Sequence, residues 1–213
     1  LAVGDLDKDG KADIVVANYG TNSLLVLHNA SSGSGIGINF TTSSPLTGLS
    51  NPRGVAIGDF DGDGKPDIVV NDQSNSRVAF YLNRNSITGT ISFTTTASLT
   101  FTTGGSPYEG ICIGDFDGDG KIDLAVANTN NTLSVLKNTT SSIGSLSFVN
   151  RVIYSTGSSP YNLVVGDMNS DGKPDVAVSN AGAGSISLFR NLANNILPPV
   201  ITLVSPLSST ISS

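Results

Sequence analysis

The chain holds very little of the residue types that catalytic and metal sites commonly use. Among its 213 residues there is one cysteine, Cys112, which excludes an internal disulfide framework and a cysteine-rich zinc site. The single histidine is His28, and no G-x-S-x-G, P-loop or H-E-x-x-H motif occurs. These absences weigh against catalysis by residues of this chain. We therefore expect it to have no enzymatic activity of its own.

Charge and long apolar runs are scarce as well. Only 13% of the residues are charged, the formal net charge is −6, and no strongly basic stretch is present. A nucleic-acid partner needs a positive footprint, so we do not expect one. No run approaches the roughly 18 apolar residues that a membrane-spanning helix requires. With 38% hydrophobic residues and a modest net charge, the sequence predicts a folded domain rather than a disordered chain.

Glycine, serine, threonine and asparagine are abundant between short apolar runs. The 24 glycines and 9 prolines favour many turns and short strands over long helices. One pattern recurs four times, at intervals of about 50 residues. It is an acidic loop with an apolar run on each side. The four loops begin at Asp5, Asp59, Asp115 and Asp167.

Each repeat is long enough for four strands. After the loop come an apolar run, a short polar turn, a second run that ends in asparagine, and a Thr/Ser-rich stretch such as residues 91–100. β-Branched and aromatic residues are enriched in these runs, as in strands. Solenoid repeats usually have about 20 to 45 residues, whereas four antiparallel strands in about 50 residues are typical of a propeller blade. We predict an all-β fold, a β-propeller of four-stranded antiparallel blades, with four repeats over residues 1–191.

The acidic residues concentrate in the four loops, and only Asp72 and Glu109 lie elsewhere. Each loop has the pattern D-x-D/N-x-D-G-x-x-D, so oxygen side chains occupy positions one, three, five and nine. Two unit charges about 5 Å apart repel by about 3 kcal/mol at an effective dielectric of about 20. Six such pairs would cost about 20 kcal/mol, more than the whole stability of a domain. A bound divalent cation is the simplest remedy.

The ligand type favours Ca²⁺ among the divalent cations. All-oxygen ligands in a flexible loop, with glycine at position six for the sharp turn, suit calcium better than zinc or copper. We expect the backbone carbonyl of a lysine at position seven to add a ligand. Asn169 replaces one aspartate, so the fourth loop should bind more weakly. The expected sets are Asp5, Asp7, Asp9, Lys11 and Asp13; Asp59, Asp61, Asp63, Lys65 and Asp67; Asp115, Asp117, Asp119, Lys121 and Asp123; and Asp167, Asn169, Asp171, Lys173 and Asp175.

Two other interpretations of the loops are available. They could be ordinary solvated Asp/Gly turns, or their clustered carboxylates could act as acid and base in catalysis. Four near-identical copies in phase argue against both, since an active site needs asymmetry among its groups. We therefore expect about four structural calcium ions.

The run V-A-I-G-D-F-D-G-D-G-K-P-D-I-V-V at residues 55–70 resembles the FG-GAP/VCBS repeat of integrin-α-like β-propellers and of many secreted bacterial proteins. The resemblance covers residues 1–191. It implies a calcium-stabilised propeller, secreted or at the cell surface, that serves adhesion or acts as an accessory module. Propellers of this family often have seven blades, so the four repeats leave open whether they close alone or need further blades.

The resemblance also indicates where a partner would bind. In integrin-like propellers, partners commonly meet the face opposite the metal loops. Arg53, Tyr108 and Tyr161 each follow a proline at equivalent places on that face. Their planar side chains could stack on a sugar or anchor a protein, or could simply pack between blades. The candidate ligand-binding residues are Tyr19, Arg53, Asp72, Tyr108, Glu109, Tyr161 and Asn162.

The function that follows is recognition of a protein or glycan by an extracellular module. The alternative is an accessory or catalytic part of a secreted polysaccharide-degrading enzyme. His28 aligns with Leu82, Lys137 and Arg190 at a strand end, and we expect it to be solvated. Cys112 aligns with small apolar residues and should be buried rather than a nucleophile.

The sequence at the two ends of the chain indicates its structure less specifically than the repeats do. Residues 192–213 could hold the fourth strand of the last blade, because residues 201–210 align with residues 91–100. They could instead lead into a following immunoglobulin-like domain, because Pro198-Pro199 and the run after them resemble the opening strand of an IPT/TIG domain. The chain begins at Leu1 without a methionine, and we expect it to be an internal piece of a longer protein.

Overall fold

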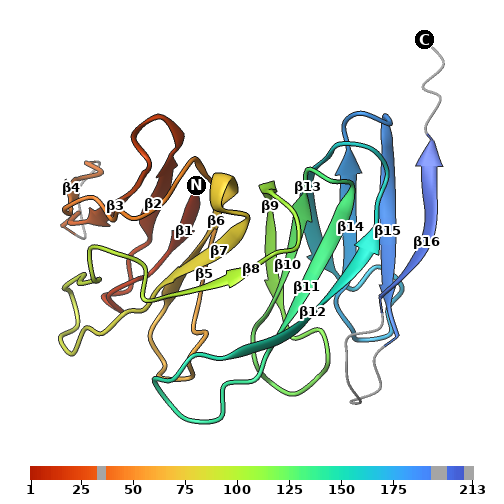
Figure 1. Cartoon of the computed structure of the whole chain (residues 1–213). Helices are drawn as coiled ribbons and strands as arrows, with labels where there is room; N and C mark the ends of the chain where they lie inside the picture. The colour runs from red at the N-terminus through yellow and green to blue at the C-terminus, as the bar shows by residue number, and fades with distance from the viewer. Residues whose placement is uncertain (33–36, 193–200, 209–213) are drawn as a thin grey trace.

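The computed structural model describes residues 1–32, 37–192 and 201–208. They form four antiparallel sheets of four strands, and within each sheet the strands follow one another in chain order (Figure 1). Each repeat is therefore one simple meander. The expected all-β fold, with one four-stranded antiparallel sheet per repeat, is confirmed.

The strands of successive sheets have similar lengths and places in the repeat. The first sheet contains β1 (Ala2–Gly4), β2 (Asp13–Asn18), β3 (Ser23–Asn29) and β4 (Phe40–Thr42). The second contains β5 (Pro52–Gly58), β6 (Asp67–Asp72), β7 (Arg77–Tyr81) and β8 (Leu99–Thr102). The third contains β9 (Pro107–Gly114), β10 (Asp123–Asn128), β11 (Thr132–Asn138) and β12 (Phe148–Ser155). The fourth contains β13 (Pro160–Gly166), β14 (Asp175–Asn180), β15 (Ser185–Asn191) and β16 (Ile201–Ser208). Two short 3-10 helices, η1 (Tyr19–Thr21) and η2 (Gln73–Asn75), lie in the turns after β2 and β6.

The register between the first two strands is the same in every sheet. The glycine before each acidic loop lies opposite the aspartate that ends the loop, as Gly58 does with Asp67. The other pairs are Gly4 with Asp13, Gly114 with Asp123, and Gly166 with Asp175. The period-2 alternation of a strand then sends successive apolar residues to opposite faces of the sheet. Each of the two middle sheets can therefore pack on a neighbour at both faces.

Three hydrophobic cores lie between consecutive sheets. Among the described residues they join the first sheet to the second, the second to the third and the third to the fourth, so the sheets form an open fan (Figure 1). The buried residues include Val15, Leu24, Ile68 and Tyr81 in the first core, Val69, Phe80, Leu124 and Val126 in the second, and Ala125, Leu133, Val176 and Phe189 in the third.

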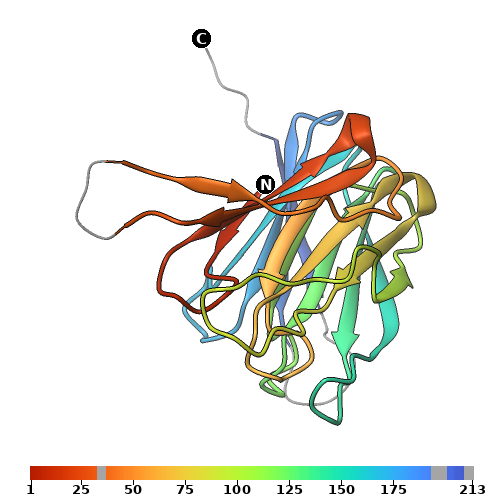
Figure 2. The same cartoon turned by 90° about the vertical axis from the view of Figure 1, so that its left-hand side faces the viewer.

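The outward faces of the end sheets differ from these cores. Cys112 lies in the third core and is 8% exposed, as expected for a small buried residue, whereas its repeat equivalent Val164 in the fourth sheet is 59% exposed. In the first sheet, Val3 is exposed. The strands β3 and β4 extend away from the body of the molecule (Figure 2).

The strand β16 pairs antiparallel with β15 and is the outer strand of the fourth sheet. Residues 193–200 and 209–213 lie outside the described residues, and with them the Pro198-Pro199 segment that suggested a following domain. Within the part of the chain that the structure describes, no helix is long and apolar enough to cross a membrane.

Candidate metal centres and the opposite face

The four acidic loops share one backbone shape and lie at the same end of the sheets, the lower end in Figure 1. At position six the glycines have φ of +86° (Gly10), +81° (Gly64), +83° (Gly120) and +80° (Gly172). This left-handed conformation favours glycine, because a side chain would be strained there. The same glycine N–H donates to the carboxylate at position one, as between Gly64 and Asp59 at 2.8 Å. The turn thus bends each loop around its first aspartate.

The aspartate at position nine ties each loop to its own sheet. Asp67 accepts hydrogen bonds from the N–H groups of Phe60 at 3.2 Å and Asn83 at 2.7 Å. Burial raises the pKa of Asp67 to about 7, although these N–H groups oppose the shift, and burial likewise raises the pKa of Asp123 to about 7. A nearby cation would favour the charged form of both carboxylates.

Three carboxylates converge in each of the first three loops. Oxygens from positions one, three and nine lie within 4.8 Å of one another in each set. Each oxygen has a second lone pair that could face a cation. In the second loop, Oδ1 of Asp59 is buried and has no hydrogen-bond partner among the described residues. All-oxygen sets of this kind fit Ca²⁺. The sets are Asp5, Asp7 and Asp13; Asp59, Asp61 and Asp67; and Asp115, Asp117 and Asp123.

The fourth loop keeps the shape with one carboxylate fewer. Asn169 stands at position three, and its Oδ1 accepts the N–H of Asp171 at 2.9 Å. Asp175 at position nine accepts the N–H groups of Met168 and Asn191, as its counterparts do. The loop therefore offers an amide oxygen where the others offer a charged one.

The aspartate at position five does not belong to these converging sets of three. Its Oδ2 contacts the lysine ammonium of position seven, at 2.8 Å between Asp9 and Lys11 and at 2.9 Å between Asp63 and Lys65. The hydrogen bond from Lys11 lowers the pKa of Asp9. Asp119 contacts Lys121 in the same way, at 3.3 Å. If a cation held by positions one, three and nine is also to bind the carboxylate at position five, that carboxylate has to leave its lysine.

A basic side chain from the end of the third strand reaches each loop, and the sequence did not reveal this. His28 Nε2 lies 2.9 Å from Asp7 Oδ2, so the expectation that His28 is solvated was wrong. Arg84 contacts Asp61 at 3.1 Å, and Lys137 contacts Asp117. In the fourth loop Arg190 reaches Asp171 Oδ2 at 3.3 Å, because position three carries no charge. The alignment of Lys137 and Arg190 with His28 was the available signal.

In the second, third and fourth repeats, the asparagine that follows or ends the third strand joins the repeat to the preceding one. The side-chain amide of Asn83 donates to the carbonyl of Leu6 in the first loop at 2.7 Å. Asn138 donates to Phe60 of the second loop, and Asn191 to Phe116 of the third, both at 2.8 Å. The recurrence of asparagine at this place was visible in the sequence, but its partner in another sheet was not.

On the opposite face, four of the candidate ligand-binding residues form one row. The guanidinium carbon of Arg53 lies 4.3 Å from the ring centroid of Tyr19 and 4.4 Å from that of Tyr108. The rings of Tyr108 and Tyr161 meet edge to face with centroids 5.0 Å apart. Because each residue belongs to a different repeat, the row crosses all four repeats. Its end residues Tyr19 and Tyr161 are 48% and 45% exposed.

The remaining three candidates lie beside or beneath this row. Glu109 accepts a hydrogen bond from Arg53 Nη1 at 3.0 Å and balances its charge. Asn162 is exposed next to Tyr161. Asp72 is fully buried, and its carboxylate accepts hydrogen bonds from the Ser50 N–H and from the side chains of Asn75 and Arg77. Asp72 therefore supports the turn after β6 instead of facing a ligand.

The comparison of the sequence with known families agrees with this repeat geometry. The FG-GAP-like repeat matches residues 5–70, 62–126 and 115–178, which together span most of the chain. The chain belongs to the FG-GAP-like repeat family. No curated protein gives a significant match to it.

Solved structures share the fold of this FG-GAP-like repeat protein at low sequence identity. A periplasmic gluconolactonase of Pseudomonas aeruginosa, PpgL, is 17% identical with a TM-score of 0.60, over 97% of this chain and 53% of that one. BBS1N, solved in complex with ARL6DN, is 15% identical with a TM-score of 0.55, over 96% of this chain and 53% of that one. The chain thus spans about half the length of these propeller-like relatives, and the likeness concerns the fold.

Proposed function

We propose that the chain is a calcium-stabilised β-propeller module of a secreted or cell-surface protein that recognises a protein or glycan and has no catalytic activity of its own. The row of Tyr19, Arg53, Tyr108 and Tyr161 carries this proposal. It is a continuous line of planar side chains, built by all four sheets, on the face away from the acidic loops. Aromatic and arginine side chains are the usual anchors of binding surfaces.

The chemistry of the row favours stacking over charge pairing. Arg53 donates to Gln73 and Glu109, both at 3.0 Å, so its guanidinium is held between two rings with its charge balanced. The most exposed side chains of the row are Tyr19 and Tyr161. A sugar ring or a flat apolar segment of a protein suits such a surface. The absence of catalysis is supported by Cys112, which is buried and whose thiol pKa is raised by burial.

Binding to glycans and proteins tests the proposal directly. A glycan array and a panel of extracellular proteins would be probed with the chain in calcium, beside hydrolase and lyase assays. Tyr161→Ala and Tyr19→Ala should each weaken binding by about tenfold or more. Ile143→Ala is the control, because Ile143 is an apolar side chain that is 79% exposed but lies in the β11–β12 connection at the loop end. Turnover of a polysaccharide would contradict the proposal and favour an enzymatic role.

In this proposal calcium has a mechanical role, which can be tested separately. A site with the affinity of extracellular modules would add about 1–2 kcal/mol at millimolar calcium. Asp61→Ala should therefore lower the unfolding midpoint in calcium. In EDTA it should change little, because burial already raises the pKa of Asp61 and makes its charge unfavourable without a cation. Calorimetric titration should find about four ions in the unaltered chain. An equal loss of stability in calcium and in EDTA would sink the calcium role.

A further inference from the structure

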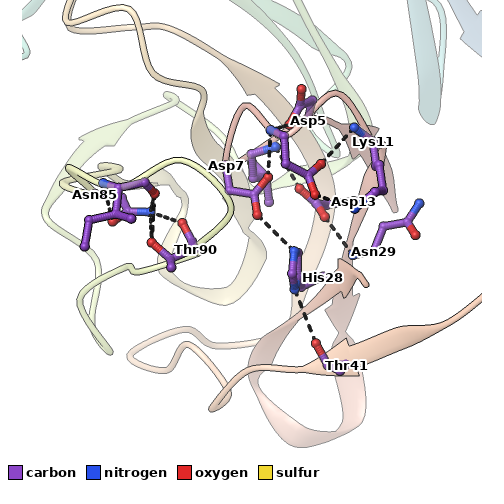
Figure 3. A network of polar contacts seen from close by, with 12 residues as sticks. Asp5, Asp7, Lys11, Asp13, His28, Asn29, Thr41, Asn85 and Thr90 are labelled. Carbon is purple, nitrogen blue, oxygen red and sulfur yellow. Dashed lines mark hydrogen bonds and ion pairs between the residues drawn. The ribbon is translucent and has the colours of Figure 1, made fainter. Parts of the chain in front are cut away.

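His28 lies beside the first loop in a place that a basic side chain fills in the other three. It belongs to the end of β3, and its ring lies between Asp7 of the loop and Thr41 of β4 (Figure 3). Nε2 is 2.9 Å from Asp7 Oδ2, and Nδ1 is 3.4 Å from the Thr41 hydroxyl. The contact with Thr41 turns Nε2 toward the loop, as an outer hydrogen bond commonly does for a metal-binding histidine.

The two facing atoms have no other partner. Asp7 is 4% exposed, and among the described residues neither its Oδ2 nor His28 Nε2 has a hydrogen-bond partner. In the tautomer whose Nδ1 carries the proton, the Nε2 lone pair lies beside the lone pairs of Asp7 Oδ2. At this distance the pair is satisfied either by a proton on Nε2 or by a metal ion bound to both atoms.

A third donor completes a set. Asp7, Asp9 and His28 offer ligand atoms within 4.8 Å of one another. One imidazole nitrogen with two carboxylate oxygens suits zinc, manganese and similar transition-series cations, whereas calcium takes oxygen ligands. We propose that Asp7, Asp9 and His28 form a transition-metal site that adjoins the calcium set of the first loop and shares Asp7 with it.

The other three loops lack an imidazole that could bind a transition metal. Beside these loops lie Arg84, Lys137 and Arg190, which are cations and contact the loop carboxylates as hydrogen-bond donors. Lys137 is the closest parallel, because its ammonium contacts both Asp117 and Asp119. A positively charged side chain repels a metal ion where the imidazole would bind one.

Metal binding at this place needs only small movements. Metal–ligand distances of about 2.0–2.2 Å would separate Nε2 and Oδ2 by a few tenths of an ångström more than they are now. Lys11, which contacts Asp9 Oδ2 at 2.8 Å, would have to leave that oxygen. Its side chain is 38% exposed and can move into solvent.

Cobalt is a suitable probe, because Co²⁺ gives visible absorption bands that report nitrogen and oxygen ligation. Untagged chain, saturated with calcium, would be titrated with Co²⁺ and then with Zn²⁺ as a competitor. We expect one Co²⁺ per chain, displaced by Zn²⁺. His28→Arg places at this position the residue that the fourth repeat carries there, Arg190, and should abolish the cobalt spectrum. Lys137→His should create a second site from Asp117 and Asp119.

Controls separate ligation from folding. Melting in calcium alone should be the same for the unaltered chain and for His28→Arg. If that variant does not fold, His28→Gln serves the same comparison without adding charge. The proposal is overturned if Co²⁺ does not bind, or if a folded His28 variant binds it with an unchanged spectrum. Neither result depends on whether the opposite face recognises a ligand.

Discussion

The first three acidic loops and the fourth have the same backbone shape but different surroundings. At position two, Leu6, Phe60 and Phe116 are each 1% exposed, whereas Met168 is 49% exposed. The carbonyls of the first three accept a side-chain hydrogen bond from the asparagine of the following sheet. Within the described residues, no sheet follows the fourth to supply this contact. A loop is thus completed by the next repeat and not by its own sequence alone.

Burial of the side chain at position three of the loops follows the same division. Asp7, Asp61 and Asp117 at position three are buried, while Asn169 of the fourth loop is exposed. Charged groups interact more strongly with an ion when water is kept away from them. The three covered loops should therefore contribute more to stability in calcium than the fourth, and the predictions below test that division.

The largest difference in stability between the third and fourth loops should come from substitution of the residue at position two. Phe116→Ala leaves a cavity in the core between the third and fourth sheets, and should lower the free energy of unfolding by about 3–5 kcal/mol. Met168→Ala, at the equivalent place in the fourth loop, should cost less than about 1 kcal/mol, because the side chain is half exposed. Urea unfolding in calcium measures both. Similar losses would show that Met168 is covered in solution.

Thiol labelling compares the same two environments without removing a packed group. Cys112 is buried between the third and fourth sheets, and burial raises the pKa of its thiol. Its modification requires a local opening and should be on the order of a hundredfold slower than that of an exposed thiol. Val164→Cys, made together with Cys112→Ala, places a thiol at the repeat-equivalent exposed site and should react quickly. Equal rates would show that the third core opens freely.

The asparagine contacts between sheets should have an intermediate effect. Asn138→Ala removes hydrogen bonds to the carbonyls of Phe60 and Ile122, and the first of these lies in a neighbouring sheet. Losing a buried partner costs about 1–3 kcal/mol. The side-chain amide of Asn29 donates to the carbonyl of Ala12 in its own loop, at 3.1 Å, and to no neighbouring sheet among the described residues; Asn29 is also partly exposed, so Asn29→Ala should cost less. Thermal melts of the two variants in calcium test this, and the reverse order would contradict it.

The repeat spacing was enough to predict the four sheets and the loop ends. An aspartate pattern around an obligatory glycine has few backbone solutions, so the convergence of positions one, three and nine follows from local sequence. What could not be predicted depends on contacts between repeats or between side chains distant in sequence. Asn138 meets a carbonyl far earlier in the chain, and Arg84 reaches Asp61 from two residues after the aligned position, Leu82. Periodicity identifies equivalent residues but does not identify their partners.

The opposite face illustrates the same limit. Arg53, Tyr108 and Tyr161 were recognisable as equivalent residues, and the structure brings them into one row with Tyr19. Asp72 was placed with them because it lies in a neighbouring turn of the sequence. Its burial depends on the side chains of Arg77 and Asn75, which fold over it. The position of Asp72 in its repeat did not predict that these side chains would bury it.

The smallest effect should come from restoring a carboxylate to the fourth loop. Asn169→Asp supplies the charge that the other loops carry at position three, and calcium affinity rises with the number of charged ligands. Because the loop is exposed, solvent screens the added attraction, so the gain should be severalfold and worth about 1 kcal/mol. Calorimetric titration should resolve it as a tightening of the weakest site, with stability in EDTA nearly unchanged. If the affinity does not rise, the missing sheet contact, and not the missing charge, limits the fourth loop.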